Sequence, residues 1–351
     1  MISGGCRDVG DLNTVDSQRD PMHQPRKILV IRRDNIGDLV CTTPLLAALR
    51  TRFPDAWIGV LANSYNAPVL SGNPDIDEVF IYTKGKHLAP GQSRWQALWQ
   101  RLRLIANLRR RQIDEVILPG GEQASARRFA RWIAPRRVLV VPSTAAGHEV
   151  ERSMVCLAAY GVTHGDADTL PPCTVVADAA LQDRLAAALP SALAGRRLVA
   201  LQLSARKPKQ RWPVERFAAL ARQLHAAHDY GFLLFWSPGA ADDPLHPGDD
   251  AKAAELVAQT HDLPLAAVPT HTLAELIAGL SLCDAVICSD GGAMHIAAGL
   301  GKPMVCLFGN SDAVRWHPWR VPHVLLQQES RDVADIGVAE ALAAWRRLPV
   351  V

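Results

Sequence analysis

Short apolar segments alternate with helical patterns along most of the chain. Beginning at Lys27, the apolar runs are KILVI, WIGVLAN, EVFIYT and EVILP, and the longest helical pattern between them covers residues 95–111. Short apolar runs that alternate with helices are typical of a parallel β-sheet with helices on both faces. The pattern therefore predicts an α/β fold.

The alternation begins again near residue 196. The apolar runs of this second series are VALQLS, GFLLFW, DAVICSD and PMVCLFG, with helical patterns between them. Two series of one architecture predict two Rossmann-like domains that face each other across a cleft, with the carboxyl ends of both sets of strands directed toward it.

The predicted domain limits follow the change in pattern. Residues 1–24 are polar and lack periodicity, which predicts a disordered leader. We expect an N-terminal domain at 25–180 and a C-terminal domain at 190–330. A weakly patterned stretch at 174–196 is the predicted linker, and 331–351 is a terminal helix that could pack on either half.

Composition excludes several classes of protein. The chain has 351 residues, 48% of them hydrophobic and 21% charged, and its formal net charge of +3 gives no indication of nucleic-acid binding. No apolar run approaches the roughly 18 residues that a membrane span needs, and the N-terminus lacks a signal-peptide pattern, so we expect a cytoplasmic protein. Its seven cysteines form no C-x-x-C pair, which favours reduced thiols over disulfides or a zinc site.

The most informative junction between a strand and a helix reads CSDGGAMH. Asp290 ends an apolar strand, Gly291 and Gly292 follow, and His295 falls in the first turn of the expected helix. Glycines let a ligand approach the backbone and free amides at a helix start attract a phosphate, so this junction predicts a diphosphate site. The alternative is a tight turn in which Asp290 caps the helix. The spacing matches neither a dinucleotide fingerprint nor a phosphate loop.

A second strand of the same half ends in a basic loop. Ser204 is followed by Arg206, Lys207, Lys209 and Arg211. Cations crowded at a strand end repel one another unless an anion lies among them, so the loop is predicted to bind the same diphosphate, with Ser204 as a hydrogen-bond donor. A solvated basic loop is the alternative.

An acidic turn follows a third strand and contains Asp242, Asp243, Asp249 and Asp250. A carboxylate at such a turn can hold ribose hydroxyls. Because Asp249 and Asp250 stand directly before a helical pattern, helix capping is the preferred interpretation.

The fourth junction, RRDNIGDLV, ends the first strand of the N-terminal half. Asp38 at its helix start can act as a general base toward a hydroxyl group, or as an N-cap for the amides of residues 39–42. Capping would hold its pKa low, which is adequate when the proton leaves after the attacked carbon has become electron-poor. A diphosphate site opposite a carboxylate is the pair that transfer from a nucleotide-linked donor to a hydroxyl requires.

These residues resemble those of a known family. The blocks KILVIRRDNIGDLVCTTP, with FPDAWIGVL after it, and SDGGAMHIAAGLGKPMVCLFG, with RWHPW after it, resemble the signature blocks of the ADP-heptose:lipopolysaccharide heptosyltransferases, glycosyltransferase family 9. The resemblance implies a GT-B fold and inverting transfer of heptose from ADP-L-glycero-β-D-manno-heptose to the lipid A–core oligosaccharide, without a metal or other cofactor. The alternatives are another nucleotide sugar or acceptor, or a protein that binds a sugar nucleotide without turnover.

The resemblance also implies that the N-terminal domain at 25–180 binds the acceptor and that the C-terminal domain at 190–330 binds the nucleotide sugar. It further implies roles for single residues. Asp38 matches the catalytic base, Asp290 the carboxylate that orients the donor sugar, and Gly292 and His295 two positions that contact the diphosphate.

Two positions depart from the family pattern. Gln210 stands where Lys usually precedes Arg-Trp-Pro or His-Trp-Pro, and Gly291 stands where Ser or Thr is common. We therefore expect Lys209 or Arg211 to supply the phosphate-binding cation, and only the backbone to donate at Gly291.

The acceptor side is predicted from two further segments. HEVERS, which begins at His148, resembles the family's His-x-x-Glu-Arg-Asn segment, and GGEQASARRFARW contributes Arg127 and Arg128. Together with Asn35 and Gly37 beside the base, these residues are predicted to bind the acceptor, because basic groups suit a phosphorylated, carboxylate-rich inner core. A solvated helix face is the alternative for the arginines.

The helical pattern at residues 95–111 is amphipathic and basic. One face carries Trp95, Leu98, Trp99, Leu102 and Ile105, and arginines surround the rest. Such a helix can lie on an anionic membrane, which would suit an enzyme with a lipid acceptor at the cytoplasmic face of the inner membrane. The commoner explanation is a crossover helix whose apolar stripe packs on the sheet.

Overall fold

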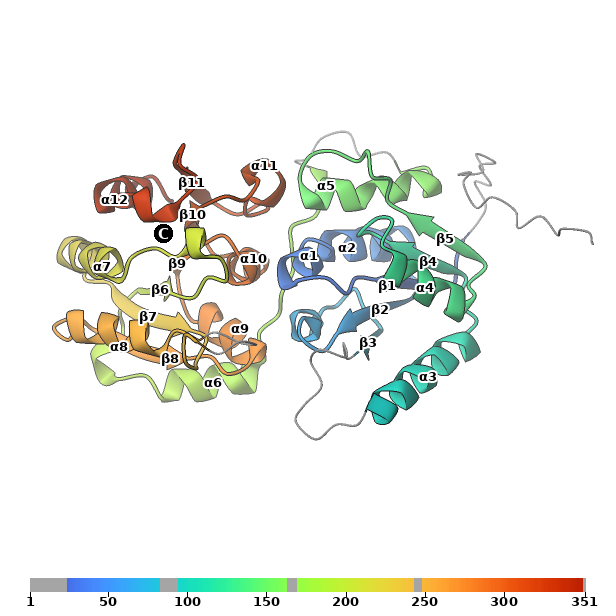
Figure 1. Cartoon of the computed structure of the whole chain (residues 1–351), viewed down its shortest axis with the longest axis horizontal. Helices are drawn as coiled ribbons and strands as arrows, with labels where there is room; N and C mark the ends of the chain where they lie inside the picture. Colours follow the sequence, from blue (N-terminus) through green and yellow to red (C-terminus); the bar gives the residue numbers. More distant parts are fainter. Residues whose placement is uncertain (1–23, 83–93, 163–168, 243–247, 350–351) are drawn as a thin grey trace, which may run out of the picture.

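The protein folds into two α/β units that lie side by side (Figure 1). The structure is a computed structural model and describes residues 24–82, 94–162, 169–242 and 248–349. The predicted leader lies outside these residues except for its last position. Each unit contains one sheet, and every strand pairing in it is parallel, as the alternation of apolar runs and helices predicted.

The N-terminal sheet has the strand order β3-β2-β1-β4-β5. Its central strands are buried on both faces, because helices cover both sides of the sheet. The strands are β1 (Lys27–Ile31), β2 (Trp57–Asn63), β3 (Glu78–Tyr82), β4 (Glu115–Leu118) and β5 (Arg137–Val140).

Two groups of helices cover the N-terminal sheet. One face packs against α1 (Ile36–Val40), α2 (Thr43–Arg52) and α5 (Glu149–Met154). The other packs against α3 (Arg94–Arg110) and α4 (Ala124–Ile133). Short 3-10 turns at Ala67–Leu70 and Val155–Tyr160 complete this unit.

The C-terminal sheet has the order β11-β10-β9-β6-β7-β8. Its strands are β6 (Leu198–Gln202), β7 (Gly231–Trp236), β8 (Leu265–Pro269), β9 (Ala285–Ser289), β10 (Met304–Phe308) and β11 (His323–Gln327). Further 3-10 turns are Ser191–Leu193, Pro208–Gln210 and Val333–Asp335.

Helices also cover both faces of this second sheet. One face of the sheet contributes to a hydrophobic core that extends into the N-terminal unit. This face is covered by α6 (Ala179–Ala187), α9 (Leu273–Ser281) and α10 (Gly292–Gly299). The outer face packs against α7 (Val214–His228), α8 (Asp250–Gln259) and α12 (Val338–Arg346). The terminal helix α12, which the sequence left unassigned, therefore belongs with the C-terminal unit.

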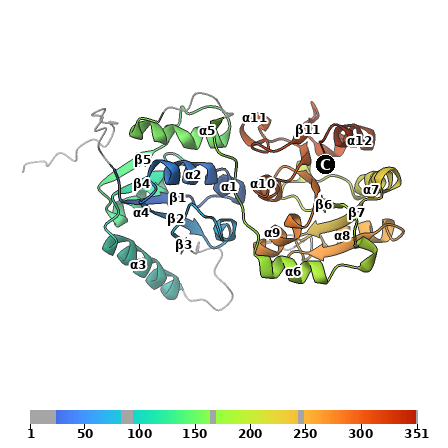
Figure 2. The same cartoon turned by 180° about the vertical axis from the view of Figure 1, so that it is seen from behind.

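The two units share one hydrophobic core where α1 packs on α10. The chain crosses between them once, in the segment that leads from α5 to α6 (Figure 2). Two backbone N–H groups of this linker form hydrogen bonds, one with each unit. The N–H of Thr174 donates to Oγ1 of Thr43 (2.9 Å), and the N–H of Val175 donates to the carbonyl of Gly299 (2.9 Å). The linker is therefore fastened to both units at neighbouring residues.

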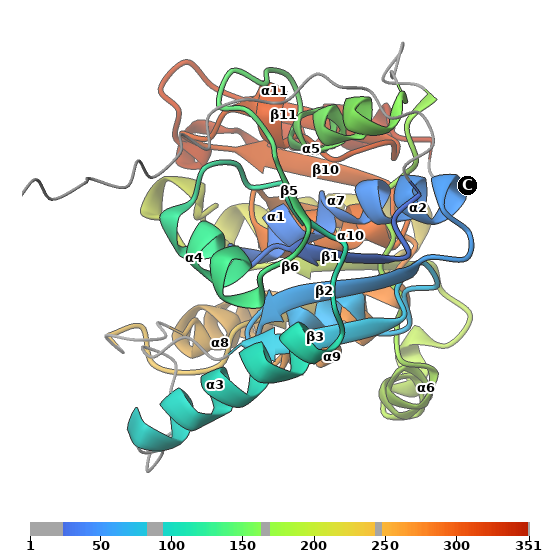
Figure 3. The ribbon, with the colours of Figure 1, turned by 90° about the vertical axis from the view of Figure 1, so that its right-hand side faces the viewer.

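Helix α3 runs along the edge of the N-terminal unit (Figure 3). Its second half packs on the sheet through Ile105 and Leu108. Its first half does not, since Trp95 is 73% exposed and Trp99 is 70% exposed. The crossover interpretation of this helix holds only for its C-terminal turns.

Candidate active site

A cavity of about 540 Å³ lies where the two units meet. It opens at the carboxyl ends of β1 and β4, the place where open parallel sheets bind ligands. Its lining residues are Arg32, Asp34, Asn35, Asp38, residues 119–123 and 141–143, Glu149, Arg152 and Arg315. Arg315, from α11 (Ala313–Trp316), is the contribution of the C-terminal unit.

Asp38 is the third residue of α1. Its Oδ2 accepts hydrogen bonds from the backbone N–H of Asn35 (3.2 Å) and from the side-chain amide of the same residue (3.0 Å), while Nη2 of Arg32 donates to Oδ1 (2.5 Å). The alternative in which Asp38 caps the amides of residues 39–42 is wrong, because the carboxylate reaches back to Asn35. Asp38 therefore accepts from the N-cap residue at the start of α1, and 13% of its side chain stays exposed at the cavity.

The surroundings of Asp38 keep its carboxyl group ionised. Burial alone would raise the pKa of Asp38, but the charge and hydrogen bond of Arg32 and the two hydrogen bonds from Asn35 outweigh burial and lower the pKa below its ordinary value. The result is a carboxylate held in one orientation by fixed donors. Such a group accepts a proton once the donating hydroxyl has become acidic.

Arg32 is a buried side chain that contacts three carboxylates. It is 2% exposed, and besides Asp38 it contacts Asp34 (Nε to Oδ2, 3.1 Å) and Glu149 (Nη2 to Oε1, 2.7 Å). The second oxygen of Glu149 accepts from Nε of Arg315 (2.8 Å) and lies 2.7 Å from Nη2 of the same guanidinium. Charges of alternating sign therefore connect the C-terminal unit with Asp38.

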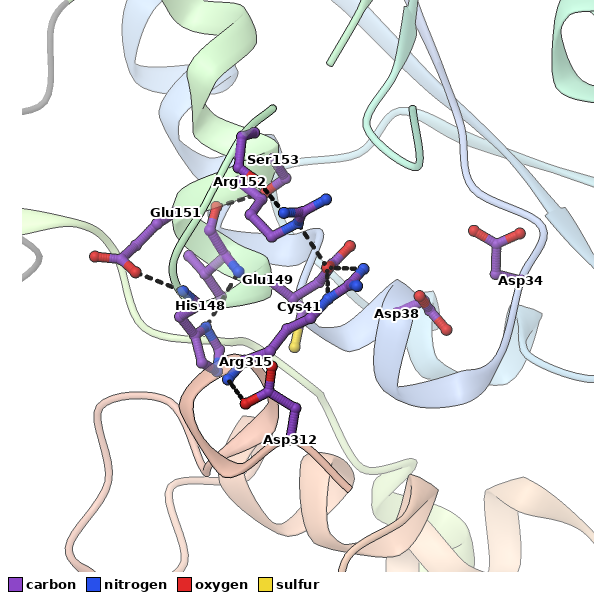
Figure 4. Close-up of polar contacts among 12 residues, drawn as sticks. Asp34, Asp38, Cys41, His148, Glu149, Glu151, Arg152, Ser153, Asp312 and Arg315 are labelled. Atoms are coloured by element: carbon purple, nitrogen blue, oxygen red, sulfur yellow. Dashed lines mark hydrogen bonds and ion pairs between the residues drawn. The ribbon is translucent and has the colours of Figure 1, made fainter. Parts of the chain in front are cut away.

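Arg152 is a further cation beside Glu149. Its Nε lies 3.5 Å from Oε2 of Glu149, and Figure 4 shows Glu149 between Arg152 and Arg315. Sequence reasoning missed Arg32, Glu149 and Arg315 as site residues. The signal for Arg32 was available, since a charged residue directly after a buried strand stands at the ligand-binding edge of the sheet. Glu149 lies in the HEVERS segment and Arg315 begins the RWHPW segment, but the two residues are 166 positions apart, and neither segment indicates that their side chains pair.

Two predicted acceptor residues flank Asp38. Asn35 is exposed, lines the cavity and orients the carboxylate. Gly37 is buried under His295 of α10, where a Cβ atom would lie 2.5 Å from Cδ2 of the imidazole. Because Gly37 has no Cβ atom, α1 can pack closely on His295 of α10.

His148, another predicted acceptor residue, lies in the contact between the units and is 1% exposed. Its Nδ1 accepts from the N–H of Val150 (3.1 Å), its Nε2 donates to the carbonyl of His317 (2.9 Å), and its ring stacks on Trp319 at 4.5 Å. Burial lowers the pKa of His148 to about 3, so the ring is neutral. Since both nitrogens are engaged and the ring is covered, His148 fastens α5 to the C-terminal unit instead of facing the cavity.

Helix α4 carries Arg127 and Arg128. Arg127 pairs with Glu122, which is one of the cavity-lining residues, whereas Arg128 is exposed. Neither arginine lines the cavity itself. They lie on the helix that begins at its rim.

Asp290 follows β9 as predicted, and its partner is Gln210. Nε2 of Gln210 donates to Oδ2 of Asp290 (2.7 Å) and to Oγ of Ser311 (2.9 Å), and Gln210 is 4% exposed. The neutral residue at the family's Lys position thus orients Asp290 without adding charge. Of the nearby cations, Lys209 is exposed, and Arg211 donates from Nε to the carbonyl of Ala205 (3.0 Å).

The glycine pair stands at the start of α10. A Cβ atom at Gly291 would meet nothing within 4 Å, whereas one at Gly292 would lie 3.1 Å from Ile36 of α1. The helix start is therefore open beside Gly291 and closed beside Gly292. His295 is 4% exposed, and its Nδ1 lies 3.6 Å from Sγ of Cys41, so this ring lies in the contact between α1 and α10.

Ser204 and the acidic turn bind one another. The hydroxyl of Ser204 donates to Oδ2 of Asp249 (2.6 Å) and accepts from the N–H of Ser237 (2.9 Å). The carboxylate of Asp250 accepts from Nε1 of Trp236 (2.7 Å). These bonds fasten the loops after β6 and β7 to the start of α8. Asp243 of the same turn lies outside the described residues.

Several other expectations concern metals, membranes and thiols. Within the described ranges, no group of three His, Cys, Asp or Glu side chains could hold a metal ion. No described helix is both long and apolar enough to cross a membrane. The six cysteines in this part of the chain are buried free thiols, and Cys41 is one of them, as expected for a small core residue.

Known proteins are similar to this chain in sequence and in fold. Residues 117–336 match the model of glycosyltransferase family 9 (heptosyltransferase). Lipopolysaccharide heptosyltransferase 3 of Escherichia coli is 28% identical over 298 residues, 81% of this chain and 83% of that protein. Lipopolysaccharide heptosyltransferase 2 of Salmonella typhimurium is 27% identical over 304 residues, with the same two coverages.

Solved structures show the same architecture. A family 9 glycosyltransferase from Veillonella parvula aligns with a TM-score of 0.75 at 19% identity, over 92% of this chain and 96% of that one. ADP-heptose lps heptosyltransferase II of E. coli aligns with a TM-score of 0.71 at 21% identity, over 91% and 97%. These alignments confirm the predicted GT-B fold. With the family model matched over more than half of its length, the chain belongs to glycosyltransferase family 9 and is a glycosyltransferase.

Proposed function

We propose that this enzyme transfers heptose from ADP-L-glycero-β-D-manno-heptose to the inner core of lipopolysaccharide, with inversion at the anomeric carbon. The observation that carries the proposal is Asp38, an ionised and oriented carboxylate in the wall of a cavity, on the helix that packs against α10. Membership of a heptosyltransferase family supports the sugar, and the names of the relatives support the acceptor.

In the proposed mechanism, Asp38 accepts the proton of the attacking hydroxyl group. The acceptor oxygen forms a bond to the anomeric carbon while the bond from that carbon to the phosphate oxygen breaks, and ADP leaves with the electron pair. Because the pKa of Asp38 is lowered, the proton moves late, when the hydroxyl has been acidified by its bond to the electron-poor carbon. Attack opposite the leaving group inverts the configuration.

The diphosphate of the donor is proposed to bind at the start of α10. The open space beside Gly291 supports this, since free N–H groups and the dipole of a helix start favour a phosphate. Lys209 is exposed and directly precedes Gln210, the partner of Asp290, so it is the proposed cation, together with Arg211. Asp290, held by Gln210, is the proposed ligand of the donor sugar.

The acceptor is proposed to enter the cavity from the side of α4. We retain Asn35, Arg127 and Arg128 as acceptor residues and add Arg152, which lines the cavity and is 21% exposed. Guanidinium groups bind carboxylates and phosphates with two hydrogen bonds, so this set suits the anionic sugars of an inner core.

The test is the release of ADP from ADP-heptose, measured with lipopolysaccharide acceptors truncated to different depths. We expect release that depends on one acceptor, and a fall of at least about 100-fold in kcat for Asp38→Asn with donor affinity retained. Asp55→Asn is the matched control, because Asp55 is an exposed aspartate in the turn before β2.

Each alternative has its own result. Release from a different nucleotide sugar, or with a different acceptor, would replace the donor or the acceptor in the proposal. Binding of ADP-heptose without release by any acceptor would identify a sugar-nucleotide-binding protein. Undiminished turnover by Asp38→Asn would contradict the role of Asp38 as the base.

We also propose that α3 and α4 rest on the cytoplasmic face of the inner membrane, where the lipid-linked acceptor lies. The exposed apolar residues of α3 are Trp95, Leu98, Trp99 and Leu102, and Trp132 of α4 is 38% exposed. The two helices pack together and contain arginines but no carboxylate. An apolar and cationic surface beside the cavity rim matches an anionic lipid surface, where each basic residue contributes about 1 kcal/mol.

Vesicle sedimentation tests this contact. Wild-type protein should bind vesicles with about 30% phosphatidylglycerol far more tightly than vesicles of phosphatidylcholine alone, and Trp99→Ala with Arg103→Gln should weaken that binding about tenfold or more. Val257→Ala, at an exposed position of α8, is the control. Equal binding to both kinds of vesicle, or undiminished binding by the variant, would contradict the contact.

A further inference from the structure

Four charged side chains, the last of them the proposed base Asp38, contact one another in a row that begins in the C-terminal unit. Arg315 contacts Oε2 of Glu149 through Nε (2.8 Å) and Nη2 (2.7 Å). Oε1 of Glu149 accepts from Nη2 of Arg32 at 2.7 Å, and the same nitrogen donates to Oδ1 of Asp38 at 2.5 Å. One guanidinium nitrogen is thus shared between Glu149 and the base.

Burial makes these contacts sensitive to the loss of any member. Arg32 is 2% exposed and Glu149 is 3% exposed, so their charges are screened weakly by solvent. Removal of one member of a buried charged set leaves its partner uncompensated. Without Arg315, Glu149 carries more unbalanced negative charge and competes with Asp38 for the shared nitrogen of Arg32.

The position of Arg315 depends on the docking of the two units. Helix α11 is capped by Asp312, which accepts from the N–H groups of Val314 (3.0 Å) and Arg315 (3.3 Å). Directly after α11, the carbonyl of His317 accepts from His148, the N-cap residue of α5. Arg315 therefore reaches Glu149 from the short helix α11. The residue that follows α11, His317, attaches this helix to the start of α5.

We propose that Glu149 and Arg315 are positioning residues, which complete the placement of Arg32 and Asp38 only when the C-terminal unit is docked on the N-terminal unit. The inference rests on the proposed function, because it concerns the same base. Neither residue needs to touch the reacting atoms. Their effect passes through Arg32, which orients the carboxylate that accepts the proton.

The charges around Asp38 give the two residues opposite effects. Arg315→Ala removes a positive charge and should raise the pKa of Asp38, whereas Glu149→Gln removes a negative charge and should lower it. The other groups facing Asp38 stay unchanged in both variants. They are Arg32 and Asp34 after β1, Arg152 of α5, and His295 of the C-terminal unit.

The test is a titration of Asp38 in the full chain by carbon-13 NMR with labelled aspartate, in which the loss of one signal in Asp38→Asn assigns the resonance. We expect the midpoint to move up by about half a pH unit in Arg315→Ala and down by a similar amount in Glu149→Gln. Arg315→Lys should restore most of the wild-type value. Arg346→Ala, an exposed arginine of α12, controls for the loss of one remote charge. Shifts of the same sign in both variants, or none beyond that of Arg346→Ala, would overturn the inference.

Kinetics supply the second readout. In Arg315→Ala, kcat for ADP release should fall about tenfold while KM for ADP-heptose changes less than about twofold, because the base is misplaced and the donor site is intact. The titration needs no substrate, so it decides the inference even if wild-type protein releases no ADP and the proposed function fails. An active wild type with unshifted titrations would leave the proposed function standing and remove the coupling.

Discussion

The substitution Gly37→Ala tests whether the contact between α1 and α10 is required for catalysis. A Cβ atom at Gly37 would lie 2.5 Å from Cδ2 and 2.9 Å from Nε2 of His295, whereas carbon atoms in contact stay about 3.5–4.0 Å apart. His295 is 4% exposed, so its ring has little space to turn into, and the ring or α1 must move by about 1 Å. Overpacking of this kind costs about 1–3 kcal/mol.

The cost should fall on the docking of the two units, because the clash lies between them. We expect kcat/KM for ADP release to fall about 5- to 150-fold, which is the same free energy expressed as a rate. The unfolding temperature in calorimetry should change little. Gly337→Ala is the control, since a Cβ atom there has an ordinary contact of 3.4 Å with Glu340.

A double-mutant cycle identifies the cause of the loss. In a His295→Ala background the added methyl group has no ring to meet, so Gly37→Ala should cost little further activity. Full activity of the single variant, or an equal loss with and without the imidazole, would refute the reasoning.

Three more predictions follow from the site. Burial lowers the pKa of His148 to about 3, below the ~6.5 of an unfolded chain, so the unfolded state binds more protons between these values and stability falls as the pH drops through this window. His148→Gln should flatten that fall by up to about 1.4 kcal/mol per pH unit, and parallel curves of unfolding temperature against pH would contradict this. Gly291→Ser should bind ADP-heptose at least as tightly as wild type, whereas Gly292→Ser, at 3.1 Å from a side chain of α1, should lower kcat/KM; equal effects would contradict the difference in space. Ser204→Ala should cost about 1–3 kcal/mol of unfolding free energy, because Asp249 loses a donor, with little change in donor KM; a large rise in KM at unchanged stability would favour direct contact with the diphosphate.

The alternation of apolar runs predicted the central strands of both sheets and the edge strand β3, but not the edge strands β5, β8 and β11. β5 and β8 have mostly partly exposed side chains, so their sequences are not the continuous apolar runs that a strand buried on both faces requires. In α3, helical periodicity identified one apolar face correctly. It could not show that Ile105 meets the sheet while Trp95 extends past it, because that depends on where the sheet ends.

The candidate site was predicted only where its residues stand in local motifs. Asp38 and Asp290 stand in recognisable blocks that follow strands, and the structure locates Asp38 at the cavity and Asp290 beside Gln210. His148 also stands in a motif, but the structure places its side chain in the contact between the two units and not at the cavity. Arg32 and Glu149 are 117 positions apart, and no local pattern reports a pairing over such a separation.

The attachment of the linker has a mechanical consequence. Thr174 and Val175 hold it to both units beside the carboxyl end of α10, so a rotation of one unit about these hydrogen bonds leaves this end of the helix in place. At 1.5 Å per residue, the helix is about 12 Å long, and a swing of about 10° displaces its opposite end by about 2 Å. That opposite end adjoins α1. A small rotation at the crossing of the chain therefore separates the start of α10, where the diphosphate is proposed to bind, from α1, which carries Asp38.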